Sequence, residues 1–269
     1  MKRLLVLFLA LALIAGFAFA EDEDEGIGLT VGLEFGVENI TDKGSDDRVP
    51  YLMPMIIYDN SFGAFDIYAE LDYIFGFTKT GDKFPQDLYF DLVLTYNLGL
   101  GDASTLSFIV ENENDTFQLS PWVDASSNIS GIVKPGIKFT QGITDFGDLY
   151  VQADVPIGYT EDPLEVGIDA ILGWDSTFGL GIKVVEHNTI KPDADYAGLD
   201  VIVSYESGPV YCEVEVDIPK DAGADGVVII PEFDLSFNAF TFYVNCSFEG
   251  VGSGGDVIIS PALGIKYSF

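Results

Sequence analysis

Few residues of this 269-residue chain have the types and spacing that enzymatic chemistry requires. His187 is the only histidine, and it stands beside Asn188 in a segment that we expect to be a loop between two strands. A histidine base needs a nucleophile or water to act on and a third group to orient it, and no nucleophile elbow or paired-carboxylate motif accompanies His187. We therefore interpret His187 as an ordinary loop residue and predict no catalytic residue and no enzymatic activity.

Acidic residues could instead hold a metal ion. The local candidates are the run 21–25, Asp46 with Asp47, and Asp193 with Asp195. None of them has the spacing of a twelve-residue calcium loop, and solvated carboxylates at a terminus or in loops explain them better. We predict no metal site and no cofactor.

The first twenty residues have the three parts of an export signal. Lys2 and Arg3 precede an apolar run that extends through Phe17, and the small-x-small sequence 18–20 ends directly before an acidic residue. A membrane-anchoring helix is the alternative, but a helical span needs about 20 apolar residues and small residues crowd the end of this run. We predict a cleaved signal peptide, and the lack of a cysteine after the cleavage site argues against a lipid anchor.

Composition limits the partners of the exported chain. Removal of the leader takes the formal net charge from −32 to −34, because two basic residues leave with it. Nucleic acid and anionic surfaces are therefore poor partners. The chain is nevertheless 48% hydrophobic and 13% aromatic, which is too apolar for a disordered coil. We expect an acidic segment, 21–25, followed by one folded unit, 26–269.

The folded unit shows the period of two that is typical of strands. From Ile27 to Glu38 every second residue is apolar and the residues between are glycine, threonine or glutamate. The pattern recurs along the chain, with no helical period and no apolar stretch as long as a helical span. The sequence therefore predicts an all-β fold in which each strand has two unlike faces.

The periodicity predicts fourteen strands. Mostly short turns follow the even-numbered strands and longer polar segments follow strands 1, 3, 5, 9, 11 and 13, as in membrane barrels with short periplasmic turns and long outer loops. The stretch 116–123 could be a fifteenth strand, but it would invert that alternation, so we reject it. The expected strand cores are 26–38, 50–59, 63–75, 87–99, 104–112, 129–140, 147–158, 164–175, 177–186, 197–206, 209–218, 227–237, 240–249 and 256–269.

Strand length distinguishes two architectures that share this alternation. Strands of about 10 to 13 residues, tilted by roughly 40°, cover about 25–33 Å, near the apolar band of a membrane barrel. Soluble β-sandwiches also alternate, because each sheet buries one face, but their strands are typically about 5–6 residues long. We favour a transmembrane antiparallel up-and-down β-barrel and keep a soluble, exported, carbohydrate-binding sandwich as an alternative.

The final segment, Leu263-Gly264-Ile265-Lys266-Tyr267-Ser268-Phe269, resembles the bacterial outer-membrane β-barrel superfamily. Members commonly finish with an alternating strand and a terminal aromatic residue. The resemblance implies a porin-like barrel in the bacterial outer membrane, in contact with its lipid. It also implies that the barrel-assembly machinery recognises the last strand through Tyr267 and Phe269. It indicates no subfamily and no substrate.

In-strand charges fall almost entirely in one phase. A charge facing lipid at the midplane would cost about 2–4 kcal/mol for Arg or Lys and less for Asp or Glu, so this phase must face the interior. The residues that we predict to line a pore are Glu34, Glu38, Asp66, Glu70, Asp72, Asp91, Asp154, Asp169, Asp200, Glu213, Glu215, Glu232, Asp234, Lys134, Lys138 and Lys183.

This predicted lining favours a channel. Fourteen strands lie between the eight that enclose only side chains and the sixteen to eighteen that enclose a water channel. Glycines in the polar phase, among them Gly32, Gly36 and Gly173, favour an open, narrow pore. Carboxylate walls concentrate cations, so we predict passive diffusion of small cations or neutral solutes with a cation preference. The alternatives are acids that form merely a solvated face, and a closed, adhesin-like barrel whose outer loops bind host or matrix molecules.

Cys212 and Cys246 are the only cysteines. Both fall in the apolar phase of two expected strands that have one strand between them. They should then be about 9.5 Å apart or more, which exceeds the roughly 7 Å limit between the Cα atoms of a disulfide. We predict two unbridged, lipid-facing residues.

Overall fold

A computed structural model describes residues 28–38, 40, 49–77, 86–116, 130–158, 164–191 and 194–269. The predicted leader, the acidic segment 21–25, the Asp46–Asp47 pair and all but the first residue of the rejected strand 116–123 lie outside the described residues. Within the described part of the chain, no helix is long and apolar enough to cross a membrane.

The described residues form strands and a single helical turn. The elements are β1 (Leu29–Glu38), β2 (Val49–Phe62), β3 (Phe65–Gly76), β4 (Gln86–Gly99), β5 (Ser104–Thr116), β6 (Ser130–Ile143), β7 (Gly147–Asp154), β8 (Ile157–Gly158), β9 (Glu165–Ser176), β10 (Leu180–Lys191), β11 (Asp195–Ser207), β12 (Val210–Pro219), α2 (Ala222–Asp225), β13 (Val227–Phe237), β14 (Phe240–Val251) and β15 (Ile258–Ser268).

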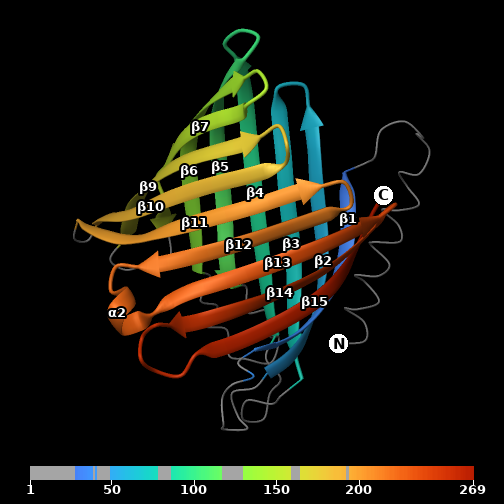
Figure 1. Cartoon of the computed structure of the whole chain (residues 1–269), viewed down its shortest axis with the longest axis vertical. Coiled ribbons are helices and arrows are strands. Elements are labelled where there is room, and N and C mark those ends of the chain that lie inside the picture. The colour runs from blue at the N-terminus through green and yellow to red at the C-terminus, as the bar shows by residue number, and fades with distance from the viewer. Residues whose placement is uncertain are drawn as a thin grey trace.

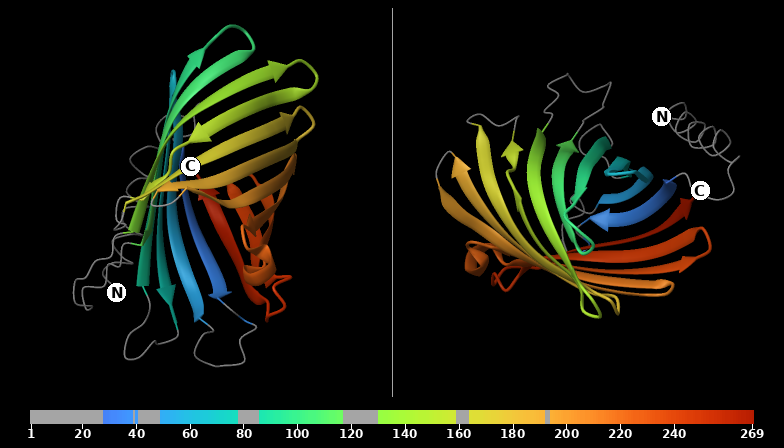
Figure 2. Two further views of the ribbon diagram at one scale, coloured as in Figure 1. Left: turned by 90° about the vertical axis from the view of Figure 1, so that its left-hand side faces the viewer. Right: turned by 90° about the horizontal axis from the view of Figure 1, so that it is seen from above.

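The strands close into one antiparallel barrel (Figure 1). Each strand pairs with its neighbour in sequence, and β15 pairs with β1, which lies beside it in Figure 2. The short β7 and β8 both pair with β6 and β9, so they are two parts of one strand. The break falls at Pro156, which has no N–H to donate to the ladder. The predicted barrel of fourteen strands is thus confirmed.

The two faces of the wall are inverted relative to a soluble protein. On β1, Leu33 and Phe35 are 43% and 44% exposed on the outside, whereas Glu34 between them is 6% exposed. On β14, Phe242 is likewise exposed while the adjacent Tyr243 is buried. A sandwich would bury its apolar phase, so this alternative is wrong for the described strands. An apolar exterior of this extent needs a covering of lipid or protein.

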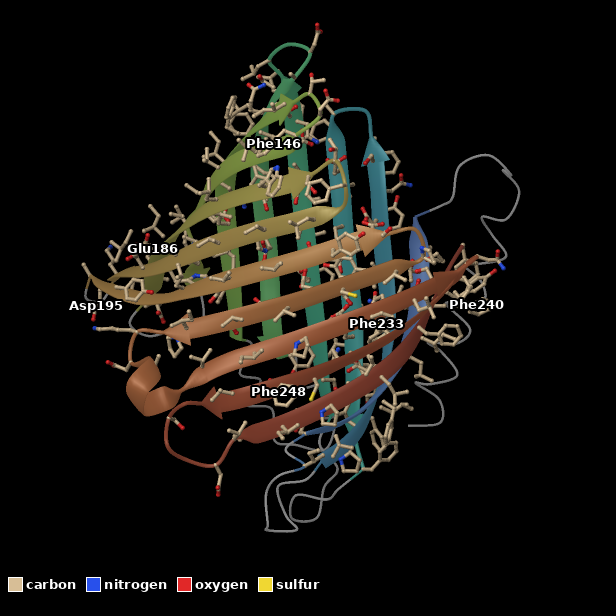
Figure 3. All side chains as sticks on the ribbon, viewed as in Figure 1. Phe146, Glu186, Asp195, Phe233, Phe240 and Phe248 are labelled. Carbon is tan, nitrogen blue, oxygen red and sulfur yellow. The ribbon has the colours of Figure 1, made fainter. Side chains whose placement is uncertain are left out.

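One rim of the barrel carries tight turns and aromatic side chains. Its connections have two to four residues, for example Gly63–Ala64, where Gly63 takes a φ of +65°. The predicted strand core 50–59 ends too early, because β2 continues to Phe62. Aromatic pairs near this rim are Phe65 with Tyr96, Phe146 with Trp174, and Phe240 with Tyr267, with ring centroids 4.8, 4.8 and 4.9 Å apart. Phe146 and Phe240 are labelled in Figure 3.

The opposite rim carries most of the longer connections, as predicted, with one exception. We expected a loop over 187–195, but β10 extends to Lys191, so the connection is only 192–194. Asn188 and Thr189 pair with Ile168 and Gly167 of β9. Their polar side chains indicate a loop in the sequence, yet at the end of a strand they are compatible with pairing. The expectation that His187 lies in a loop is therefore wrong.

Candidate functional site: the barrel interior

The sixteen residues predicted to line a pore lie on β1, β3, β4, β6, β7 and β9–β13. All occupy the phase opposite to the exposed apolar residues. Glu34, Asp154 and Asp169 are buried, Glu38 at the end of β1 is exposed, and the other twelve are half-buried. The structure therefore brings these side chains together on one face of the wall.

We call strands β12–β15 and β1–β4 the tyrosine side. Here phenol groups, rather than cations, hold three of the interior carboxylates. The hydroxyls donate from Tyr51 to Glu34 over 2.7 Å, from Tyr211 to Glu213 over 2.5 Å, and from Tyr68 to Glu70. A neutral donor satisfies a carboxylate oxygen without cancelling its charge. Lys266 is the only lysine or arginine within these described strands, so acidic side chains far outnumber basic ones on this side.

We call strands β5–β11 the histidine side. Lys134 pairs with Glu111 over 3.2 Å. His187 lies between two carboxylates, with its Nδ1 2.8 Å from Asp169 and its Nε2 2.5 Å from Asp200. Only the protonated ring can donate a hydrogen bond from both nitrogens, so the arrangement favours an imidazolium. Cations thus compensate part of the acidity on this side and tie β9, β10 and β11 together.

The contacts of His187 differ from the predicted loop, although the sequence carries a signal for them. Lys183, Val185 and His187 are spaced by two, which continues the inward phase of β10. Extending that period by one residue pair would have placed the ring inside the wall. The polar Asn188 and Thr189 that follow led instead to the assignment of a loop.

Asp200, Glu215 and Asp217 form the one group of potential metal ligands within the described residues. One carboxylate oxygen from each lies within 4.8 Å of the others. Such oxygens suit a hard cation. The same spacing also arises wherever acids crowd adjacent strands, and Asp200 already contacts His187. We assign no resident metal to it.

Four interior glycines leave no empty space on the wall. A Cβ added at Gly36, Gly173 or Gly264 would overlap the ring of a cross-strand partner, namely Tyr51, Tyr150 or Tyr243 respectively. Gly32 is covered in the same way by Met55. These four glycines therefore give no evidence of empty space in the interior, contrary to the prediction from the sequence. Their effect is to let large side chains lie along the wall instead of projecting toward the axis.

The remaining predicted residues lie at the ends or outside of the wall. The ring of Tyr267 is 4.9 Å from that of Phe240 and 4.8 Å from that of Phe269. The recognition of Tyr267 and Phe269 by an assembly machinery stays a prediction. Cys212 and Cys246 are both free, which confirms the expected lack of a disulfide.

No protein-family model matches the sequence, and no curated protein matches it at a significant level. Solved structures do resemble it. The match to the deltaS2 mutant of the TodX monoaromatic hydrocarbon channel covers 89% of this chain and 88% of the TodX chain, with 8% identity and a TM-score of 0.50. The P. putida toluene transporter TodX also matches, with 11% identity, coverage of 95% of this chain and 92% of that chain, and a TM-score of 0.46. A mutant of the Rh. blastica porin matches with 12% identity, coverage of 90% of this chain and 99% of that chain, and a TM-score of 0.45.

At such identities the similarity concerns the fold. Together with the closed antiparallel wall, the apolar exterior and the short-turn rim described above, it leads to one conclusion. The chain has a closed antiparallel β-barrel fold similar to that of the TodX channel, with an apolar exterior.

Proposed function

We propose that the mature chain is a bacterial outer-membrane channel for the passive diffusion of small solutes, with a preference for cations. In this proposal residues 1–20 are removed on export, 21–25 form a short acidic segment and 26–269 form the barrel. The channel performs no chemistry and needs no cofactor. Its partners are outer-membrane lipid, small cations or neutral solutes, and the barrel-assembly machinery.

Placement in a membrane is supported by the exterior of the wall. Large apolar side chains are exposed on the outer face of both the tyrosine side and the histidine side, for example Phe35, Leu172 and Leu263, which are 44%, 58% and 60% exposed. Aromatic residues such as Trp174 and Phe240 gather near the short-turn rim, as they do where a barrel crosses the interface between lipid and water. A lipid bilayer would cover these surfaces without a partner protein.

The observation that carries the channel proposal is the concentration of carboxylates on the interior face. Thirteen acids and three lysines make up the predicted lining. Negative charge inside a low-dielectric shell raises the local concentration of cations and repels anions. The tyrosine rings that lie over Gly36, Gly173 and Gly264 also support an open channel, because rings that lie against the wall take up less of the space near the barrel axis.

One experiment distinguishes the proposed channel from the alternative, a closed, adhesin-like barrel. The mature chain is refolded in detergent and inserted into a planar bilayer, and current is recorded at fixed voltage. The channel proposal expects discrete conductance steps, and it expects liposomes that contain the protein to swell in small neutral sugars. Folded protein that gives neither steps nor swelling would contradict the proposal and favour the closed barrel.

A further inference from the structure

A polar cavity of about 250 Å³ opens at the short-turn end of the interior, bounded by β1, β2 and β11–β15. Most of its strand residues belong to the inward phase, and five of them carry hydroxyl groups, namely Thr30, Tyr211, Ser236, Thr241 and Ser268. The cavity is therefore built from the wall of the barrel, at the mouth of the proposed channel.

The cavity holds charges of both signs, which distinguishes it from the rest of the tyrosine side. Lys266 lines it, with its Nζ 4.7 Å from the ring centroid of Tyr243. Glu206 and Asp234 supply the negative charges. Within the described residues Lys266 makes no ion pair, so its ammonium group keeps donors for an anionic partner.

Asp234 lines the cavity from β13, so an ammonium group of a solute bound there would meet its negative charge. The hydroxyls nearby already pair with one another, Thr30 with Ser268 and Ser236 with Thr241, each over 2.9 Å. These pairs can still accept or donate one further bond to a solute.

We propose that this cavity binds a small zwitterion, whose ammonium group contacts Asp234 and whose carboxylate contacts Lys266. This proposal identifies a class of solute for the proposed channel and therefore rests on the proposed function. Equilibrium binding does not require conduction, however, and can be measured on the folded barrel in detergent. A pure cation would meet Lys266 as a repulsive charge, and a pure anion would meet Asp234 and Glu206 in the same way.

The test uses three probes of matched size on the folded mature chain: 4-aminobutyrate, n-butylamine and butyrate. Isothermal titration in detergent should show that 4-aminobutyrate binds at least about tenfold more tightly than either single-charge probe, because charge-assisted contacts at both ends add. Equal affinity for 4-aminobutyrate and n-butylamine would overturn the proposal and leave a cation site only. Absence of binding by all three probes would also overturn it.

Variants locate the site. Lys266→Gln should weaken 4-aminobutyrate about tenfold and leave it no better than n-butylamine, and Asp234→Asn should leave it no better than butyrate. The matched control is Lys138→Gln, since Lys138 also stacks on an interior tyrosine, Tyr150, but does not line the cavity. Equal effects of the two lysine variants would overturn the proposal.

Two further results separate folding and conduction from binding. If Lys266→Gln does not fold, Lys266→Arg replaces it and should bind 4-aminobutyrate within about threefold of the wild type. Asp234→Asn still tests the contact with the ammonium group. Loss of binding in Lys266→Arg together with unchanged binding in Asp234→Asn would overturn the proposal. Binding without conductance in the planar bilayer would contradict the channel and support the site. Conductance without binding would contradict the site alone.

Discussion

The tyrosine side and the histidine side are built from the same strand pattern but treat interior charge differently. On the histidine side, His187 and Lys134 contact three carboxylates directly. On the tyrosine side, hydroxyls such as those of Tyr51 and Tyr211 satisfy carboxylate oxygens and leave the charge in place. A period of two therefore fixes which face is polar, whereas the cross-strand partner decides whether the charge remains.

This difference assigns separate roles to the two sides. The compensated histidine side should contribute more to the stability of the barrel, because its ion pairs join neighbouring strands. The tyrosine side, where acidic side chains far outnumber basic ones, should contribute more to the potential inside the barrel, at the expense of repulsion among its own acids. Substitutions on the two sides should then change different measured quantities.

The largest effect is expected from removing charge on the tyrosine side. The triple variant Glu34→Gln, Glu70→Gln and Glu213→Gln should lower the ratio of K⁺ to Cl⁻ permeability several-fold, because the three carboxylates that accept hydrogen bonds from tyrosine hydroxyls lose their negative charge. The ratio follows from the reversal potential in a KCl gradient. Glu186→Gln is the control, since Glu186 is exposed on the outward phase of β10, and it should leave the ratio unchanged. An unchanged ratio in the triple variant would remove the tyrosine side from the account of selectivity.

On the histidine side, His187→Gln should lower the free energy of unfolding by about 1–3 kcal/mol, because the buried Asp169 and the half-buried Asp200 lose their cationic partner. Urea unfolding in detergent, followed by heat-modified mobility on a gel, measures the change. Lys183→Gln, on the same inward phase of β10, is the control and should cost less. If both variants unfold at the same urea concentration as the wild type, the histidine contacts do not stabilise the wall.

The same contacts predict a dependence on pH. Deprotonation of His187 leaves one N–H for two carboxylates, so the wild-type barrel should lose stability as pH rises through the titration of the ring. His187→Gln should lack this component, and the two unfolding curves should converge at alkaline pH. A difference between them that stays constant from acid to alkaline pH would show that the charge of the ring is irrelevant.

A smaller effect, common to both sides, is expected at the covered glycines. Gly173→Ala on the histidine side and Gly264→Ala on the tyrosine side should each push a tyrosine ring toward the axis, reducing single-channel conductance and costing about 1–3 kcal/mol of stability. Gly99→Ala is the control, because an added Cβ there meets no atom within 4 Å. Conductance that falls equally in all three variants would exclude the tyrosine rings as the cause.

Much of the fold follows from the sequence because period and turn spacing are local properties. Fourteen strands, the inward phase of Glu34 and Asp169, and the free Cys212 and Cys246 were all predictable in this way. The contacts of His187 with Asp169 and Asp200 were not, because they depend on the register between neighbouring strands. For the same reason the sequence indicated that glycines such as Gly173 leave space, whereas their partner strands supply the rings that cover them.

The reversal potential of the wild-type barrel in a KCl gradient tests the central claim most directly. Interior carboxylates should let K⁺ pass more readily than Cl⁻, so the current should reverse at a voltage of the sign set by the K⁺ gradient, and this voltage should shrink as salt screens the interior. A reversal potential of the opposite sign, or one at zero for every gradient, would contradict the account.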